Sequence, residues 1–132
     1  MIVDKLGRRF KNLRVSLTAA CNYACTYCVP DGKRLMPAKQ ELTALELLKL
    51  VSYLKDASGI DKVRITGGEP LITPKFDEFL MGLGELGFED VSLTTNAQKL
   101  SEKIDVIEAA GIKRLNISLD TLNPLKFKQI AR

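Results

Sequence analysis

Short segments rich in β-branched residues alternate along this chain with longer segments whose apolar residues have helical spacing. The strand-like segments are residues 13–18, 62–66, 90–96 and 114–120, and the helical ones are residues 43–59, 76–87, 101–110 and a last one that begins at Asn123 and Pro124. Because the connections are short, this alternation predicts a parallel sheet covered by helices. We expect an α/β fold, a partial TIM-like barrel of about four βα units, since a complete barrel takes about 250 residues.

Local signals mark the ends of several expected helices. Thr43 and Glu46 have the spacing of a capping box at the start of the first helix. Gly111 is a typical residue just past the end of the third helix, and Asn123 with Pro124 suits the N-cap and first position of the fourth. The fourth strand of such a half barrel would present an unpaired edge.

Polar or glycine-rich clusters follow each expected strand directly. They are the cysteine run 21–28, the Gly-Gly-Glu-Pro run 67–70, Thr94–Thr95–Asn96 and Ser118–Leu119–Asp120. In β/α barrels and open α/β sheets, active sites are built at the carboxyl edge of the strands. The four clusters are therefore expected to meet at one site.

The three cysteines lie within eight residues, as Cys21, Cys25 and Cys28, and the chain has no histidine. This spacing can place three thiolates on three irons of a cubane 4Fe-4S cluster and leave the fourth iron open to a substrate or cofactor. Structural zinc is a weaker interpretation because no His or further Cys can supply a fourth ligand. A disulfide is weaker still, since it leaves one cysteine unpaired.

Composition narrows the class of protein. The net charge of +4 is modest, and Lys and Arg are mixed with acidic residues along the 132-residue chain, so charge gives no indication of nucleic-acid binding. The first ten residues lack the apolar run of a signal peptide, and no window offers the roughly 20 apolar residues of a membrane span. We expect one domain, no membrane association and a reducing, cytoplasmic location.

The cysteine motif with Tyr27, combined with the Gly-Gly-Glu-Pro run, resembles the radical S-adenosylmethionine (radical SAM) superfamily. Within it, the chain is similar to the GTP 3′,8-cyclase family of molybdenum cofactor biosynthesis, through residues 7–10, 13–18, 63–71, 94–96 and 116–120. The resemblance implies that residues 1–132 are a radical SAM core domain whose carboxy-terminal part is absent. The family's second cysteine triad and its terminal Gly-Gly tail are missing, and Ala97 stands where the family usually has Gly.

The resemblance also implies roles for individual residues. Cys21, Cys25 and Cys28 match the ligands of the 4Fe-4S cluster; Tyr27, Gly68, Glu69 and Ser118 match contacts to S-adenosylmethionine; Arg14, Arg64 and Thr94 match contacts to the substrate GTP. No side chain is assigned as catalytic, because the cofactors carry the chemistry. The resemblance implies that the reduced cluster cleaves S-adenosylmethionine to methionine and a 5′-deoxyadenosyl radical. In the cyclase family this radical takes a hydrogen atom from the ribose of GTP, and the resulting carbon radical attacks carbon 8 of guanine.

Several of these residues also have purely structural interpretations. Tyr27 can pack against the loop, and Glu69 can solvate a strand end. Gly68 can belong to a plain turn, whereas the resemblance implies that it leaves room for the amino group of the cofactor to approach the backbone. Arg14 and Arg64 have the planar, forked donors that suit phosphate and purine edges, although arginines beside strands are commonly surface charges. Ser118 can be a strand-end hydroxyl without a ligand. Asn96 can be a turn-forming residue, or it can orient the ribose or the cofactor.

The sequence leaves three interpretations of function open. The first is the amino-terminal portion of a GTP 3′,8-cyclase. We expect such a protein to receive its electron from a donor such as flavodoxin or ferredoxin, and a homodimer is compatible with this interpretation. The second is another radical SAM enzyme, acting on a peptide or a tetrapyrrole. The third is a non-catalytic cluster-binding or assembly module that pairs through its open sheet edge.

Overall fold

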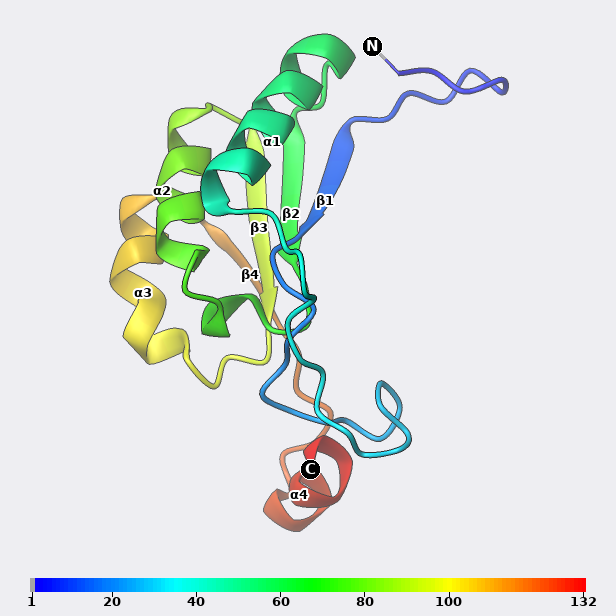
Figure 1. Cartoon of the computed structure of the whole chain (residues 1–132), viewed down its shortest axis with the longest axis vertical. Helices are drawn as coiled ribbons and strands as arrows, with labels where there is room; N and C mark the ends of the chain where they lie inside the picture. The colour runs from blue at the N-terminus through cyan, green and yellow to red at the C-terminus, as the bar shows by residue number, and fades with distance from the viewer. Residues whose placement is uncertain (1) are drawn as a thin grey trace.

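The computed structural model describes residues 2–132 and contains a single four-stranded parallel sheet in which the strands stand in chain order. The strands are β1 (Asn12–Ser16), β2 (Lys62–Thr66), β3 (Asp90–Thr95) and β4 (Arg114–Ile117). Their carboxyl ends all lie at one edge, which is the lower edge in Figure 1. The α/β fold and the four βα units of a partial barrel are confirmed.

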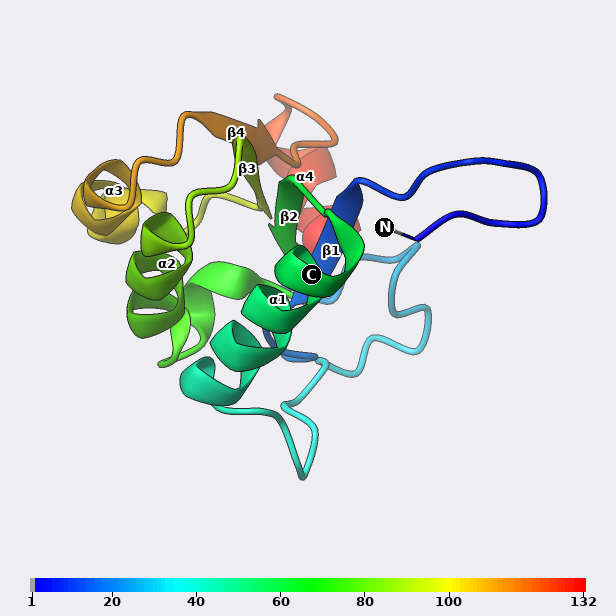
Figure 2. The same ribbon diagram turned by 90° about the horizontal axis from the view of Figure 1, so that it is seen from above.

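Three helices cover one face of the sheet, and the fourth lies apart from them. The helices α1 (Ala44–Ser58), α2 (Phe76–Glu85) and α3 (Leu100–Ala109) form a layer on one side, while α4 (Pro124–Ala131) lies below the carboxyl ends of the strands (Figures 1 and 2). A short 3-10 helix, η1 (Pro70–Ile72), follows β2. The sequence pattern did not predict η1, because a single turn leaves no periodic signal.

The expected helix ends are present. The Thr43 hydroxyl accepts from the Glu46 N–H at 3.2 Å while the Glu46 carboxylate accepts from the Thr43 N–H at 2.8 Å, which completes the capping box. The Asn123 side chain accepts from the N–H groups of Leu125 and Lys126. Gly111 has a left-handed φ of 75° just after α3.

Element bounds differ from expectation by up to three residues. The first strand ends at Ser16 rather than Thr18, although Leu17 still donates to the Thr66 carbonyl at 3.0 Å. The fourth ends at Ile117 rather than Asp120, after which the Ser118 N–H donates to the Thr95 carbonyl at 2.9 Å. In both places pairing stops because the chain leaves the sheet to form a loop at the carboxyl edge.

Strict alternation along the strands gives the sheet two different faces. Val15, Val63, Ile65 and Leu93 are buried in the core beneath the helices. The helices contribute a second row of buried residues: Phe76, Phe79, Leu80 and Leu83 of α2, Val51 of α1 and Ile107 of α3. The opposite face carries only polar residues in register, among them Arg14 opposite Arg64 and Arg64 opposite Ser92.

The outer strands are paired on one side only within residues 2–132, since β1 pairs with β2 and β4 pairs with β3. The free edges of β1 and β4 therefore keep unpaired backbone donors and acceptors. No described helix is long and apolar enough to cross a membrane.

Candidate functional site

The four clusters that follow the strands meet around one cavity of about 150 Å³ at the carboxyl edge of the sheet. Its lining comprises Cys21, Tyr23, Cys25, Tyr27, Cys28, Thr66, Gly68, Glu69, Thr94, Thr95, Asn96 and Ser118. Eight of the ten residues to which the resemblance gives a role are in this lining; Arg14 and Arg64 are not. Their gathering follows from the parallel strand order, because each loop leaves the sheet at the same edge.

The cysteine run forms a compact loop with its own hydrogen bonds. The N–H groups of Cys28 and Val29 both donate to the Cys25 carbonyl, at 2.9 and 2.8 Å, and the Cys21 N–H donates to the Leu35 carbonyl at 3.1 Å. All three thiols are free. A second cavity, of about 360 Å³, is also lined by Cys21, Cys25 and Cys28, so the thiols lie between two hollows.

The end of α4 supports this loop from below. The N–H groups of Ala24 and Thr26 donate to the carbonyls of Ala131 and Ile130, each at 2.9 Å. The carbonyls in the last turn of a helix have no partner within the helix, so the loop satisfies them. The rings of Tyr23 and Phe127 pack edge to face at 5.7 Å. The fourth helix thus holds the backbone between Cys21 and Cys28.

Gly68 lies where the backbone of the cysteine loop passes closest to the β2 loop. Its N–H donates to the Thr18 carbonyl at 2.8 Å, and the next N–H, of Glu69, donates to the Ala20 carbonyl at 2.8 Å. A Cβ at Gly68 would lie 2.1 Å from the Ala20 carbonyl oxygen. Glycine is therefore required here by the chain's own backbone, a reason that the sequence did not reveal.

Glu69 is buried, with 2% of its surface exposed, so it does not solvate a strand end. One carboxylate oxygen accepts from the Leu71 N–H at 3.1 Å and the Thr95 hydroxyl at 2.6 Å, and the other accepts from the Asn96 N–H at 2.8 Å. The side chain thus ties the loop after β2 to the loop after β3. Any cofactor contact it makes shares these oxygens with three protein donors.

Asn96 connects the β3 loop to the cysteine loop. Its side-chain amide donates to the Asn22 side-chain oxygen at 2.9 Å, and its own oxygen accepts from the Gln98 N–H at 3.0 Å. The Asn22 amide in turn donates to the Gln98 side chain. Asn96 therefore does form a turn, as its structural interpretation predicted, and it also contacts the cysteine motif.

Tyr27 and Ser118 lie on opposite loops of the same cavity. Tyr27 is 66% exposed, so it does not pack as an aromatic core residue. Its hydroxyl donates to an Asp120 carboxylate oxygen at 3.1 Å. Partial burial of the hydroxyl and this hydrogen bond both raise the pKa of Tyr27 above its ordinary value. Tyr27 thus connects the cysteine loop to the loop after β4.

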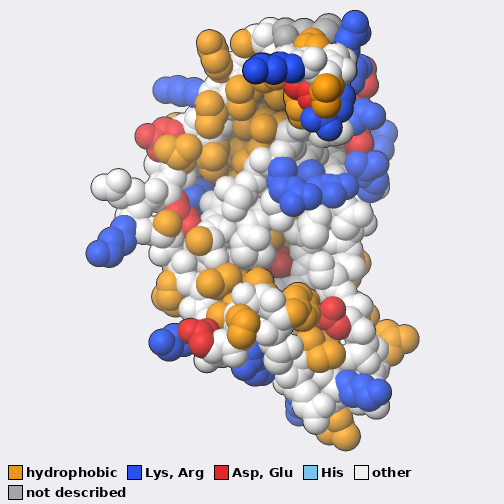
Figure 3. Space-filling model, turned by 90° about the vertical axis from the view of Figure 1, so that its right-hand side faces the viewer, with side chains coloured by type: hydrophobic (Ala, Val, Ile, Leu, Met, Phe, Trp, Pro, Cys, Tyr) orange, Lys and Arg blue, Asp and Glu red, His pale blue; other side chains and the backbone are white. Residues whose placement is uncertain are grey.

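Arg14 and Arg64 lie farther from the carboxyl edge on the polar face of the sheet, in a separate cavity of about 360 Å³ that Lys62, Ser92 and Arg114 also line. Thr94 is two residues beyond Ser92 on the same face of β3 and lines the cavity beside the cysteines, so residues of both cavities lie on the same polar face. Figure 3 views the side turned away from α1, α2 and α3, where Lys and Arg side chains gather. Within residues 2–132, neither Arg14 nor Arg64 has an ion-pair partner.

The three thiols fit an iron-sulfur cluster better than a single metal ion. No three Cys, Asp or Glu side chains in the described part of the chain converge closely enough to hold one ion. A tetrahedral zinc needs such convergence, with each sulfur about 2.3 Å from the metal. A cubane takes one thiolate on each of several irons, which suits thiols spaced along a loop. Burial raises the pKa of the Cys21 thiol above its ordinary value.

Comparison with known protein families shows to which family a chain with this site belongs. A family model described as the Radical SAM superfamily matches residues 15–132. The chain belongs to the radical SAM superfamily. The match begins in β1 and covers every element that lines the cavity, so the cysteine loop and the Gly-Gly-Glu-Pro run are those of a radical SAM domain.

Curated relatives of this radical SAM domain carry the name GTP 3′,8-cyclase. The chain is 44% identical to that of Peptoclostridium acidaminophilum, 41% to that of Rhizobium leguminosarum bv. trifolii and 40% to the mitochondrial one of Arabidopsis thaliana. Each match covers 99% or 100% of this chain but only 41%, 38% and 34% of the respective relative. The chain thus spans about two fifths or less of the length of these proteins.

Solved structures support the same fold. Streptococcus suis SuiB bound to its precursor peptide SuiA superposes with a TM-score of 0.73 at 22% identity, over 92% of this chain and 27% of SuiB. BtrN in complex with AdoMet and 2-DOIA gives a TM-score of 0.70 at 19% identity, over 93% of this chain and 51% of BtrN. At these identities the likeness establishes the radical SAM fold alone.

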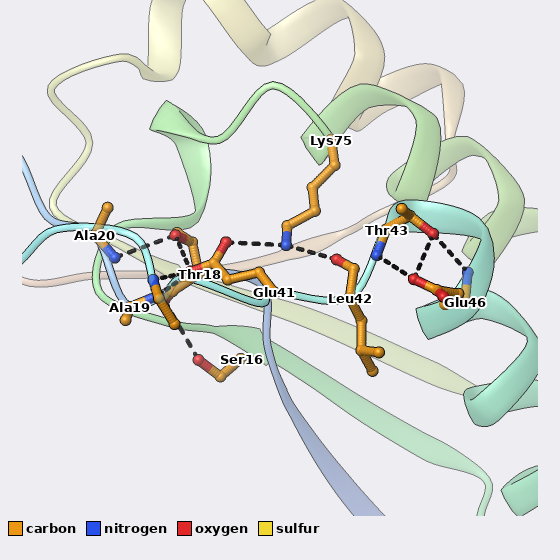
Figure 4. A network of polar contacts seen from close by, with 10 residues as sticks. Ser16, Thr18, Ala19, Ala20, Glu41, Leu42, Thr43, Glu46 and Lys75 are labelled. Carbon is orange, nitrogen blue, oxygen red and sulfur yellow. Dashed lines mark hydrogen bonds and ion pairs between the residues drawn. The ribbon is translucent and has the colours of Figure 1, made fainter.

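Some residues that build the radical SAM site were not singled out in the sequence. Asn22 and Gln98 complete the hydrogen bonds between loops, and Glu41 anchors the start of the cysteine loop (Figure 4). Asn22 lies inside the cysteine motif, which was a usable signal. Glu41 lies in a polar stretch without periodicity, 20 residues after Cys21, where nothing in the sequence distinguishes it from a surface carboxylate.

Proposed function

We propose that this chain is the amino-terminal radical SAM core of a GTP 3′,8-cyclase. The observation that carries the proposal is that two cavities lie along the same polar face of the sheet. The cavity at the carboxyl edge brings together the cysteines, Gly68 and Ser118, and the same polar face carries Thr94, Arg14 and Arg64. The names of the relatives support the choice of substrate.

In this proposal the chain's residues bind and orient the cofactors. Cys21, Cys25 and Cys28 would hold a 4Fe-4S cluster, which supplies the electron that cleaves S-adenosylmethionine to methionine and a 5′-deoxyadenosyl radical. Tyr27, Gly68, Glu69 and Ser118 would contact S-adenosylmethionine. These residues come from the cysteine loop and from the loops after β2 and β4, and all four line the cavity beside the cysteines.

Arg14, Arg64 and Thr94 would bind GTP. The two arginines are neighbours across β1 and β2, and both are exposed, so their guanidinium groups can donate to phosphate or purine oxygens. Lys62 and Arg114 line the same cavity and add positive charge, although Arg114 also pairs with Asp90 at 2.6 Å. We assign the reducing electron to a small donor protein such as flavodoxin or ferredoxin.

The test uses anaerobically reconstituted, reduced chain. We expect iron and sulfide at about four each per chain, and release of 5′-deoxyadenosine that increases when GTP is added. Arg14→Ala with Arg64→Ala should abolish the response to GTP and leave the basal release unchanged. The matched control is Arg8→Ala, which removes an exposed arginine that pairs with Asp4 in the amino-terminal turn.

Each other outcome favours a different function. Release that ignores GTP would indicate another radical SAM reaction, for example on a peptide or tetrapyrrole. A loaded cluster with no release would favour a cluster-binding module that pairs through the free edges of β1 and β4. Failure to bind iron in the wild-type chain would reject the proposed cofactor site.

A further inference from the structure

Glu41 connects three segments that are far apart in the sequence. One carboxylate oxygen accepts from the Thr18 hydroxyl at 2.8 Å, the Ala19 N–H at 2.9 Å and the Ala38 N–H at 3.2 Å. The other oxygen pairs with the Lys75 ammonium at 3.1 Å, just before α2 (Figure 4). The carboxylate therefore joins the end of β1, the loop before α1 and the start of α2.

The Glu41–Lys75 pair is largely shielded from water. The side chains of Glu41 and Lys75 are 19% and 14% exposed, and Lys75 also donates to the Leu42 carbonyl at 2.8 Å. The contacts that converge on Glu41 come from three protein donors and one cation, so its position is fixed from several directions. A solvated surface carboxylate would not have this arrangement.

The segment that Glu41 holds leads directly into the cofactor site. The Thr18 hydroxyl, which donates to Glu41, accepts from the Ala20 N–H at 3.1 Å. The Thr18 and Ala20 carbonyls accept from the N–H groups of Gly68 and Glu69, both at 2.8 Å. Cys21 is the next residue. Two steps of hydrogen bonding thus separate Glu41 from the Gly-Gly-Glu-Pro loop and from the first cysteine.

We propose that Glu41 is a positioning residue for the cofactor site. Its carboxylate fixes residues 18–20, and these residues set the spacing between Cys21 and the backbone of Gly68. Glu41 itself lines neither cavity beside the cysteines, so its effect is exerted through Thr18 and Ala19. This inference rests on the proposed binding of a cluster and S-adenosylmethionine at that site.

A cofactor-free measurement tests the structural half of the inference. In the wild-type chain, the amides of Ala20, Gly68 and Glu69 are hydrogen-bonded through residues 18–20. Glu41→Ala should increase their hydrogen-exchange rates by about tenfold or more, because local opening loses its main anchor. Exchange no faster than in the matched control would overturn the proposal, whether or not the protein binds any cofactor.

The matched control is Glu46→Ala. Glu46 follows Glu41 by five residues and also accepts hydrogen bonds, but only from Thr43 in the capping box of α1 (Figure 4). This variant should lower thermal stability without changing exchange at Gly68 or Glu69. Equal acceleration in both variants would mean general destabilisation and would reject a specific role for Glu41.

A second measurement tests the functional half on reconstituted protein. Glu41→Ala should weaken the affinity for S-adenosylmethionine by about tenfold. This is the lower end of the loss seen when a residue that hydrogen-bonds and orients the ligands of a metal site is removed. Glu46→Ala should bind as the wild type does. Unchanged affinity in Glu41→Ala would overturn the proposal, whereas a wild-type chain that binds no S-adenosylmethionine would reject the proposed function and leave the exchange result to decide this one.

Two further variants keep the test decisive if Glu41→Ala does not fold. Glu41→Gln retains an acceptor oxygen for Thr18 and Ala19 but loses the charge, and Lys75→Met removes the cation while leaving Glu41 in place. Both should accelerate exchange at Gly68 less than the alanine variant and more than Glu46→Ala. Exchange rates equal to those of the control in both variants would contradict the proposal.

Discussion

The Thr95 hydroxyl donates a 2.6 Å hydrogen bond to the carboxylate of Glu69, and both residues are buried at the carboxyl edge of the sheet. Through this contact the loop after β2 is attached to the end of β3. A buried carboxylate is tolerated only when its oxygens are well satisfied, and Glu69 also accepts from two backbone N–H groups. The Gly-Gly-Glu-Pro run therefore has a structural role in addition to any role toward a cofactor.

Glu69→Ala should lower the free energy of unfolding by about 3 kcal/mol or more, because it leaves buried donors without an acceptor. Thr95→Val removes one of the three donors and should cost about 1–2 kcal/mol. Urea denaturation at pH 7 measures both. Glu85→Ala, at an exposed position of α2, serves as the control and should change stability by less than about 0.5 kcal/mol. Equal losses at Glu69 and Glu85 would contradict the assigned role.

Gly68→Ala should destabilise the chain far more than a glycine change at an open position. A Cβ at Gly68 would lie 2.1 Å from the Ala20 carbonyl oxygen, so the two loops must separate. Gly111→Ala is the comparison, because a Cβ there meets nothing within 4 Å and only the left-handed φ of 75° is unfavourable, at about 1 kcal/mol. In thermal unfolding, the melting temperature of Gly68→Ala should be clearly lower than that of Gly111→Ala.

Ala97→Gly should stabilise the chain by about 1 kcal/mol. Ala97 has a φ of 63°, which is unfavourable for any residue with a Cβ, and it stands where the resembling family usually has Gly. The positive φ is therefore the physical source of the expected gain. Ala109→Gly, in the last turn of α3, should have the opposite sign. A loss of stability in Ala97→Gly would show that the turn does not hold this conformation in solution.

The stability that Glu41 confers should depend on pH in acid. Burial raises the pKa of Glu41, but the hydrogen bonds from Ala19 and Thr18 and the Lys75 ammonium outweigh it, and the pKa falls to about 2 from an ordinary 4.5. A carboxyl whose pKa is lower in the folded state stabilises the fold above the unfolded pKa. This contribution should be complete above pH 4.5 and should be lost as the pH falls toward 2.

The difference in unfolding free energy between wild type and Glu41→Gln isolates this contribution, since the other carboxyl groups are common to both. The difference should be constant from pH 5 to pH 7 and shrink below it. A difference that is independent of pH down to 2.5 would show that the Glu41 charge does not contribute to stability.

The order of elements was predictable because each strand and helix carries its own local signal. The capping box at Thr43 and Glu46 and the N-cap at Asn123 depend only on neighbours in the chain, and both are present. The meeting of the cysteines with Gly68 and Ser118 at one cavity was also predictable, because parallel strands direct their loops to one edge.

Long-range side-chain contacts were not predictable. Glu41 and Lys75 are 34 residues apart, and Glu69 and Asn96 are 27 apart, so no local period relates the members of either pair. The support of the cysteine loop by Ala131 and Ile130 depends on where α4 is placed, which only the folded backbone determines. The same limit applies to Gly68, whose requirement for glycine comes from the carbonyl of Ala20 in another loop.

The agreement between the order of strands in the sheet and their order in the chain has a consequence for biosynthesis. Each strand pairs with the strand translated just before it, so the growing sheet always offers a finished template to the next segment that emerges from the ribosome. The cysteine loop precedes the Gly-Gly-Glu-Pro loop in the chain, so the Thr18 and Ala20 carbonyls have already been synthesised when the Gly68 and Glu69 N–H groups that donate to them emerge. The partners of the cysteine loop are thus synthesised after it, with Gly68 and Glu69 ahead of Ile130 and Ala131.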